Sequence, residues 1–279
     1  MCLTGVDSHR IDPAIAAFYE QISEEDRLEQ GPFLLEAIRT RELIERFRPG
    51  VPATILDVGG AAGAYALWLA DAGYTVHLID AVPRLIAEAR RRNMGRSRPL
   101  ASCDVGDARS LGFPDAMADA VLLLGPLYHL TTAADRGRAL AEAARVLRPG
   151  GYLFAAAISR WASALDGLSR DLFRDARFAS IVEIDVRDGQ HRNPTGQPDY
   201  FTTAYFHRPD DLRAEVVDAG LSVEALVGIE GPAWLLPDID ERLQDSRRRA
   251  DLLRVARQLE SEPSVLGTSA HLLVVGRKP

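Results

Sequence analysis

The stretch from Ile55 to Asp80 reads ILDVGGAAGAYALWLADAGYTVHLID, and it decides the fold. It begins with a short apolar run, which predicts a buried parallel strand, and continues into a turn that contains glycine. A helical segment then runs to Gly73, since glycine commonly ends a helix. A second apolar run follows and closes in Asp80. Strand, turn, helix and strand in this order predict a half-fold that binds nucleotide ligands.

The same alternation of strands and helices continues along most of the chain. Because parallel strands are joined by helical crossovers, this alternation predicts an α/β fold with a doubly wound, mostly parallel sheet. We expect seven strands, at residues 53–59, 74–80, 99–104, 118–125, 152–159, 221–231 and 271–277.

The remaining segments surround this predicted sheet. Residues 1–50 carry two helical patterns, which we interpret as an N-terminal helical brace or lid. We assign residues 51–279 to the nucleotide-binding domain. Within that domain the alternation is interrupted at about 160–206 and about 232–263, and we interpret both segments as helical lid insertions near the active face.

Composition narrows the classes of function. The 279 residues carry a net charge of −7, and an acidic surface repels phosphate backbones, which disfavours nucleic acid as a partner. We find no apolar run of membrane-spanning length and no signal-peptide pattern, so we expect a cytoplasmic protein without a membrane partner. The two cysteines, Cys2 and Cys103, have no CxxC spacing and predict no metal site. Lys278 is the only lysine in an arginine-rich chain, which indicates a bacterial source with a GC-rich genome.

The first turn of the sheet distinguishes between adenosyl ligands. A dinucleotide fingerprint needs G-x-G-x-x-G, but Ala61 and Ala64 stand where its second and third glycines would follow Gly59. Asp57 ends the first strand, close to where a pyrophosphate would lie, and two charges about 4 Å apart interact by ~4 kcal/mol at an effective dielectric of about 20. Asp57 therefore favours a cationic ligand such as S-adenosylmethionine (SAM) over NAD, although a helix-capping role would also explain it.

Further acidic residues fit an adenosine ligand. Asp80 can accept hydrogen bonds from both ribose hydroxyls, a role that does not separate NAD from SAM. Asp107 follows the third predicted strand and can accept from the adenine amine, while the amide of Ala108 can donate to a ring nitrogen. Asp104 lies nearby, but a turn-capping role explains it equally well.

Taken together, these residues resemble the class I SAM-dependent methyltransferases, which have a Rossmann-like fold. The family's first motif, (D/E)-x-G-x-G-x-G, stands here as Asp57, Gly59 and Gly63, with Ala61 replacing the middle glycine. The other matches, in chain order, are Asp80 at the ribose acid, residues 106–108 at the adenine-side turn, 118–130 at the fourth strand and its loop, and 145–159 at the helix, turn and fifth strand.

The resemblance covers roughly residues 50–158, with a tail from 209 to 279. It implies the strand order 3-2-1-4-5-7-6, with strand seven antiparallel. It also implies SAM as the cofactor and S-adenosylhomocysteine (SAH) as the product. We expect the cofactor to be bound by Asp57, Gly59, Gly60, Gly63, Asp80, Asp107, Ala108 and Gly125.

The resemblance implies that residues beyond the fourth and fifth strands bind the acceptor, because acceptors meet the methyl group there in this family. Tyr128 can form a wall, and His129 can accept a proton near neutral pH, although packing against the next helix would also explain it. Tyr205 and His207 lie in an aromatic segment, 198–207, and share one face of a strand, as they would in an ordinary half-buried strand. We expect His129, Tyr128 and His207 to be catalytic, and Tyr19, Arg160, Trp161, Tyr205 and Trp234 to bind the acceptor.

The remaining histidines receive no catalytic role. His191 stands in a polar, turn-rich stretch and is expected at the surface. His77 and His271 lie on the second and last strands, and we interpret both as structural. His9 precedes the first helical pattern.

The function that fits these features is methyl transfer from SAM to O, N or C of a small-molecule acceptor by in-line displacement. We expect a monomer or a homodimer. Two alternatives remain open, an NAD(P)-dependent oxidoreductase and a non-catalytic SAM- or SAH-binding protein of the same fold.

Overall fold

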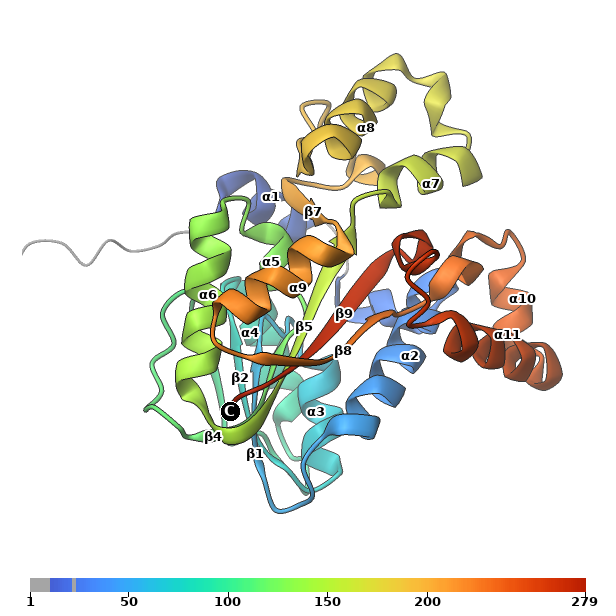
Figure 1. Ribbon diagram of the computed structural model, residues 1–279. Coiled ribbons are helices and arrows are strands. Elements are labelled where there is room, and N and C mark those ends of the chain that lie inside the picture. The colour runs from blue at the N-terminus through green and yellow to red at the C-terminus, as the bar shows by residue number, and fades with distance from the viewer. Residues whose placement is uncertain (1–10, 22–23) are drawn as a thin grey trace, which may run out of the picture.

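The computed structural model describes residues 11–21 and 24–279, so Cys2 and His9 lie outside the described residues. Its centre is a twisted β-sheet with helices on both faces (Figure 1). The strands are β1 (Thr54–Val58), β2 (Thr75–Asp80), β3 (Ser102–Val105), β4 (Ala118–Leu123), β5 (Leu147–Ser159), β6 (Gln190–His191), β7 (Ala204–His207), β8 (Ser222–Gly228) and β9 (His271–Arg277).

The predicted strand order is confirmed. Five parallel strands lie side by side in the order β3-β2-β1-β4-β5. β9 pairs antiparallel with β5, and β8 pairs antiparallel with β9. With β8 counted as the sixth strand and β9 as the seventh, this is the order 3-2-1-4-5-7-6 with an antiparallel seventh strand.

The expected number of strands was wrong, because the sheet has nine rather than seven. β7 pairs in parallel with Ile158 and Ser159 at the end of β5, and β6 pairs antiparallel with β7. Since β9 already occupies one edge of β5 at Ile158, β7 takes the other edge, beyond the end of β4. Strands of two and four residues are too short to show a recognisable period in the sequence.

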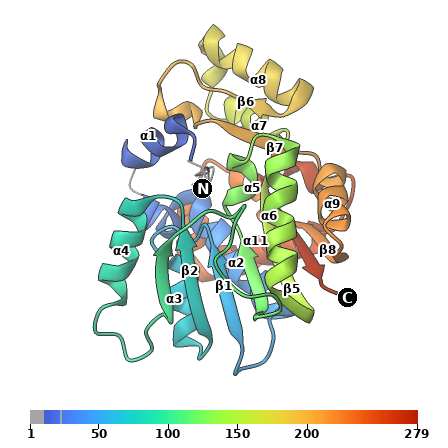
Figure 2. The ribbon, with the colours of Figure 1, turned by 90° about the vertical axis from the view of Figure 1, so that its left-hand side faces the viewer.

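Helices cover both faces of the sheet (Figures 1 and 2). On one face lie α2 (Gly31–Phe47), α3 (Ala64–Asp71) and α4 (Pro83–Asn93). On the other lie α6 (Ala133–Val146) and α9 (Pro209–Asp218). The central strands are buried on both faces, which explains why their sequences are continuous apolar runs. In the described part of the chain, no helix is long and apolar enough to cross a membrane.

The other helical elements lie around the carboxyl edge of the sheet and beside α2. Their bounds are α1 (Pro13–Gln21), η1 (Glu24–Glu29), α5 (Pro126–His129), α7 (Ala162–Ser169), η2 (Leu172–Arg174), α8 (Ala176–Asp188), η3 (Pro198–Tyr200), η4 (Gly231–Leu235), α10 (Ile239–Gln244), α11 (Ser246–Leu259) and η5 (Leu266–Thr268). In Figure 1, α7 and α8 stand above the sheet, whereas α10 and α11 pack beside α2.

Helix α1 lies between the first insertion and α4. The rings of Phe18 and Phe201 meet edge to face with centroids 5.4 Å apart, and Thr202 Oγ1 donates to the carbonyl of Ala14 at 3.2 Å. On the opposite side, Arg84 Nη2 donates to the carbonyl of Tyr19 at 2.7 Å. These contacts hold α1 across the top of the sheet.

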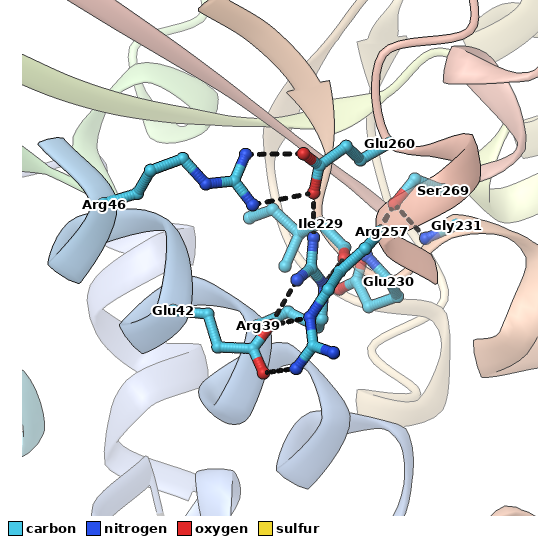
Figure 3. Close-up of polar contacts among 9 residues, drawn as sticks. All are labelled: Arg39, Glu42, Arg46, Ile229, Glu230, Gly231, Arg257, Glu260 and Ser269. Carbon is cyan, nitrogen blue, oxygen red and sulfur yellow. Dashed lines mark hydrogen bonds and ion pairs between the residues drawn. The ribbon is translucent and has the colours of Figure 1, made fainter. Parts of the chain in front are cut away.

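A buried arginine links α2 to the second insertion (Figure 3). Arg39 is fully buried, donates from Nε to the carbonyl of Ile229 at 3.2 Å, and pairs with Glu42 and Glu260. Arg46 reaches the same Glu260 from the surface, at 2.5 Å. The network joins α2, the end of α11 and the loop that follows β8.

We predict that Arg39→Ala lowers the free energy of unfolding by about 3–5 kcal/mol, because it leaves Glu260 with its buried partner removed. Arg46→Ala is the matched control, since it removes an exposed partner of the same carboxylate and should cost less than about 1 kcal/mol. Urea denaturation measures both changes. Equal losses of unfolding free energy in the two variants would contradict a larger contribution from the buried Arg39 contact.

Candidate active site

The turn after β1 is held by Asp80 at the end of β2. Asp80 Oδ2 accepts from the amide of Ala61 at 2.9 Å, and Oδ1 accepts from the amide of Val82 at 2.8 Å. Burial raises the pKa of the Asp80 carboxyl, and these amide hydrogen bonds oppose that rise. Ala61 adopts a positive φ of 48°, a left-handed conformation that alanine reaches at some cost. The turn therefore closes with Ala61 in place of glycine.

Asp57, at the end of β1, lies under this turn. Gly60 packs directly on it, since a Cβ at Gly60 would lie 2.5 Å from Asp57 Oδ2 and 2.4 Å from Leu78 Cδ1. Any larger residue at position 60 would therefore clash. Gly63 begins α3 with a φ of 87°, a left-handed conformation that glycine adopts without a Cβ penalty.

The carboxylate of Asp57 is buried and has no cationic partner among the described residues. Its side chain is 1% exposed, and neither oxygen has a hydrogen bond of normal geometry to the described residues. Burial raises the pKa of Asp57 to about 7, the nearby Asp80 carboxylate adds to the rise, and the amide of Ala66 opposes it only weakly. A cation placed beside Asp57 would remove most of this cost.

A cavity of about 490 Å³ opens above these residues, along the carboxyl edge of the sheet. It begins near β2 and β3 and extends past β4 to Ala156, Ile229 and His271, at the ends of β5, β8 and β9. The predicted cofactor residues that line it are Asp57, Gly59, Gly60, Asp80, Asp107, Ala108 and Gly125. Gly63 does not line the cavity and shapes the turn instead.

At the β3 end of the cavity, Asp107 already has a partner. Its carboxylate accepts from Arg109, with Nη2 at 2.6 Å from Oδ2, and Arg109 also reaches Asp135 at 3.3 Å. An adenine amine would share the carboxylate with this guanidinium. The backbone of Ala108 lines the same end of the cavity.

Tyr19, Tyr128 and His129 form one wall of the cavity. Tyr19 Oη lies 2.8 Å from His129 Nε2, and the carbonyl of Thr203 lies 3.3 Å from His129 Nδ1. Because a carbonyl can only accept, Nδ1 carries the proton and Nε2 accepts from Tyr19. Burial lowers the pKa of His129 to about 4, so the ring is neutral at physiological pH and its lone pair is engaged.

The other predicted acceptor residues do not line the cavity. His207 is fully buried and contacts Glu215 at 3.2 Å. Arg160 donates to the carbonyl of Phe206, and its guanidinium lies over the ring of Tyr205. The guanidinium of Arg136 also lies over this ring, 3.7 Å from its centroid. The predicted shared face of Tyr205 and His207 is confirmed, since their rings meet at 4.7 Å. These residues pack the first insertion onto the sheet.

The two tryptophans also have structural contacts. Trp161 packs against Gly267, and Trp234 Nε1 donates to the carbonyl of Thr268 at 2.9 Å. The surface location expected for His191 was wrong, because its ring is 1% exposed. His191 is held between Asp185, at 2.9 Å, and the carbonyl of Tyr200, at 2.8 Å. The prediction failed because the residues next to His191 in the sequence are polar although the ring itself is buried.

Sequence reasoning missed a charged group at the β9 end of the cavity. His271 Nδ1 lies 2.6 Å from Glu230 Oε1 and 3.8 Å from Glu36 Oε2, and Arg27 pairs with Glu36 at 2.7 Å. Burial alone would lower the pKa of His271, but the two carboxylates together raise it to about 9. His271 was interpreted as structural, although an antiparallel last strand begins at the edge where the parallel strands end.

Glu36, Glu230 and His271 also meet a geometric condition for a cation site, since one potential ligand atom from each lies within 4.8 Å of the others. The four carboxylate oxygens and His271 Nδ1 are already engaged, however. Both Glu36 oxygens accept from Arg27, and both Glu230 oxygens accept from Ser269 or His271. A metal ion would have to displace all of these contacts, so the group is better described as a hydrogen-bonded cluster.

Comparison with known proteins finds relatives that are named methyltransferases. Residues 56–155 match the family model described as a methyltransferase domain. A malonyl-[acyl-carrier protein] O-methyltransferase from Geobacter sulfurreducens is 34% identical over 206 residues, which cover 72% of this chain and 68% of the relative. A ubiquinone/menaquinone biosynthesis C-methyltransferase, UbiE, from Acidiphilium cryptum is 32% identical over 158 residues, 54% of this chain and 59% of the relative. The chain thus matches about three fifths to two thirds of the length of these relatives.

Solved structures share the fold. A SAM-dependent methyltransferase from Methanosarcina mazei aligns with a TM-score of 0.57 at 20% identity, covering 85% of this chain and 96% of that one. An S-adenosylmethionine-dependent methyltransferase from Mesorhizobium loti aligns with a TM-score of 0.56 at 17% identity, covering 88% of this chain and all of that one.

We predict that Asp57 makes the folded protein less stable as the pH rises. The folded state holds a proton with a pKa of about 7, whereas the unfolded chain releases it near 3.8. The contribution to the free energy of unfolding therefore falls between about pH 4 and pH 7 and is constant above that range. Relative to the wild type, Asp57→Asn should gain stability across this window, by roughly 4 kcal/mol at most. Urea denaturation at pH 4.5 and pH 8 measures the difference, and parallel pH profiles would contradict it.

Proposed function

The chain belongs to the class I SAM-dependent methyltransferases, and we propose that it transfers the methyl group of SAM to a small molecule held in the cavity above the sheet. SAM carries a sulfonium and an ammonium group, so it would supply the cationic partner that the Asp57 carboxylate lacks. The uncompensated Asp57 carboxylate on the cavity wall is the observation that carries the proposal.

The extent of the cavity supports a small acceptor. It runs from β2 to β9, four strand spacings, or about 19 Å at roughly 4.8 Å each. We place adenosine at the Asp80 and Asp107 end, because Asp80 can accept from ribose hydroxyls. The methyl group then points along the edge of the sheet, past β4, toward His271. Helix α1 covers this space with Tyr19, and a covered cavity fits a small molecule better than an open groove would.

Methyl transfer requires mainly orientation and exclusion of water, because the cofactor supplies the leaving group. Holding the acceptor atom in line with the methyl group at about 3–3.5 Å can contribute ~7–11 kcal/mol. Tyr19, Tyr128 and His129 form the wall that would orient the acceptor. In this arrangement His129 acts by holding Tyr19 in place, since its lone pair is occupied by the Tyr19 hydroxyl.

We also propose that α1 and the first insertion act together as a lid. Phe18 on α1 meets Phe201 of the insertion, and Thr202 bonds to the α1 backbone. The relatives include an O-methyltransferase and a C-methyltransferase by name, so either acceptor atom fits the comparisons. The net charge of −7 disfavours a nucleic acid substrate.

We expect SAM and SAH to raise the melting temperature, and NADH to leave it unchanged. Ligand at a hundred times its dissociation constant stabilises the folded state by about 2.7 kcal/mol. Thermal shift assays with the three ligands measure this. Stabilisation by NADH, or by none of the three, would contradict the proposal. Methyl transfer to a panel of phenols, amines and carboxylic acids then separates an enzyme from a protein that only binds SAM.

Asp80→Ala should weaken SAH binding by at least about tenfold, because each hydrogen bond to a charged acceptor contributes about 1.5–3 kcal/mol. Asp104→Ala is the matched control, since this exposed carboxylate at the end of β3 does not line the cavity. Isothermal calorimetry compares the two variants. Equal affinities for Asp80→Ala and the wild type would remove Asp80 from the cofactor site.

A further inference from the structure

The β9 end of the cavity contains a histidine, His271, whose ring is held by the carboxylate of Glu230. His271 is the first residue of β9, and its Nδ1 lies 2.6 Å from Glu230 Oε1. The other oxygen of Glu230 accepts from Ser269 Oγ at 2.7 Å and from the amide of His271 at 3.0 Å. Glu230 is therefore held in place, and its Oε1 accepts a hydrogen bond from Nδ1 of His271. When the ring is unprotonated, its lone pair consequently lies on Nε2.

That second nitrogen is available to a ligand. Nε2 of His271 has no hydrogen-bond partner among residues 11–21 and 24–279, and the side chain lines the cavity while remaining only 17% exposed. Nε2 of His271 thus has unused hydrogen-bonding capacity at this end of the cavity.

The position of Glu230 is fixed by the network in Figure 3. Arg39 donates to the carbonyl of Ile229, the residue before Glu230. The amides of Glu230 and Gly231 both donate to Ser269 Oγ, at 3.0 and 3.2 Å. The loop that carries Glu230 is thereby tied to α2 and to the segment that precedes β9, which keeps the carboxylate on the imidazole.

The cavity thus presents two histidines with opposite properties. His129 uses its lone pair on Tyr19, and burial keeps its affinity for a proton low. In its unprotonated form His271 has a lone pair on Nε2 that no described residue uses, and three charged groups act on the ring, namely Glu230 after β8, Glu36 on α2 and Arg27 on η1. The two carboxylates outweigh the more distant guanidinium and increase the proton affinity of His271. Of the two, only His271 is arranged to accept a proton from a ligand.

We propose that His271, held by Glu230, is the general base of the reaction and accepts the proton of an acidic hydroxyl, a phenol or an enol, on the methyl acceptor. This inference rests on the proposed methyl transfer and names its substrate class. It replaces His129, which the sequence favoured, as the proton acceptor.

The chemistry of the acceptor selects this class. A carboxylate is already ionised at neutral pH and needs no base. A phenol, with a pKa of about 10 as in tyrosine, is close to the pKa of about 9 of His271, so the proton can pass between them at little cost. An aliphatic hydroxyl holds its proton too strongly for this base.

The reaction consists of a proton transfer to His271 and a methyl transfer to the acceptor oxygen. The O–H bond of the acceptor breaks and its proton binds Nε2 of neutral His271, whose Nδ1 proton stays on the hydrogen bond to Glu230. The electron pair left on the acceptor attacks the methyl carbon of SAM, and the carbon–sulfur bond breaks with its electron pair going to sulfur. The products are the methylated acceptor, SAH and protonated His271, which returns its proton to solvent.

The pH dependence of kcat/KM should follow the protonation of His271. Only the unprotonated form of His271 accepts a proton, so kcat/KM should rise with pH and level off above about 9. Glu230→Gln removes one carboxylate from the ring and should move the inflection to lower pH. His129 cannot produce this profile, because its pKa of about 4 lies below the range.

The direct test uses 4-nitrophenol, whose absorption changes when the phenol ionises, with the SAH complex of the protein. We expect bound probe to ionise at a pH at which free probe does not. The ionised band should be lost in His271→Asn and reduced in Glu230→Gln. His77→Asn is the matched control, since His77 lies on β2 away from the cavity and should leave the band unchanged.

SAH calorimetry on every variant separates the possible failures. If the wild type does not bind SAH, the proposed function fails. Three outcomes with a wild type that binds SAH would overturn the assignment of His271. The probe does not bind, or it binds without ionising, or it ionises equally in the wild type and in His271→Asn. With an active phenol from the acceptor panel, His271→Asn should lower kcat by about 10²-fold or more while SAH affinity stays within about twofold. A parallel loss of SAH affinity would assign His271 to the cofactor instead.

Discussion

Two buried carboxylates on neighbouring parallel strands are the constraint on which the site depends. Asp80 ends β2 and is satisfied by the amides of Ala61 and Val82, so it closes the first turn of the sheet. Asp57 ends β1 beneath the same turn, with no hydrogen-bond donor of normal geometry among the described residues. The structure therefore satisfies the Asp80 carboxylate with backbone hydrogen bonds and gives the Asp57 carboxylate none of normal geometry from the described residues. This asymmetry fits SAM and disfavours a pyrophosphate.

The fold, and the residues that line the β2 and β3 end of the cavity, could be predicted because their signals are local. Continuous apolar runs identify strands that are buried on both faces, and Asp57, Asp80 and Asp107 each stand at or just beyond the end of such a run. The alternation of strands and helices predicts the parallel part of the sheet. Strands β6 and β7 were missed, since two to four residues cannot show a period.

The β9 end of the cavity could not be predicted, because its contacts join distant segments. Glu36 and His271 meet only once α2 and β9 are packed, and their spacing in the chain carries no signal. Aromatic and charged residues at the exits of the sheet, such as Tyr205 and Arg160, were predicted to bind the acceptor, yet they stack on each other and hold the first insertion to β5. Burial, rather than residue type, decides which polar side chains reach the cavity.

We propose that the cavity holds SAM with its charged end at Asp57 and its methyl group directed toward β9. A crystal structure of the SAH complex would locate the ligand. We expect it to show ribose hydroxyls on Asp80, the ammonium group near Asp57, and the sulfur facing a space bounded by His129 and His271. Adenosine bound away from the turn at residues 59–63, or a sulfur directed away from His271, would contradict it.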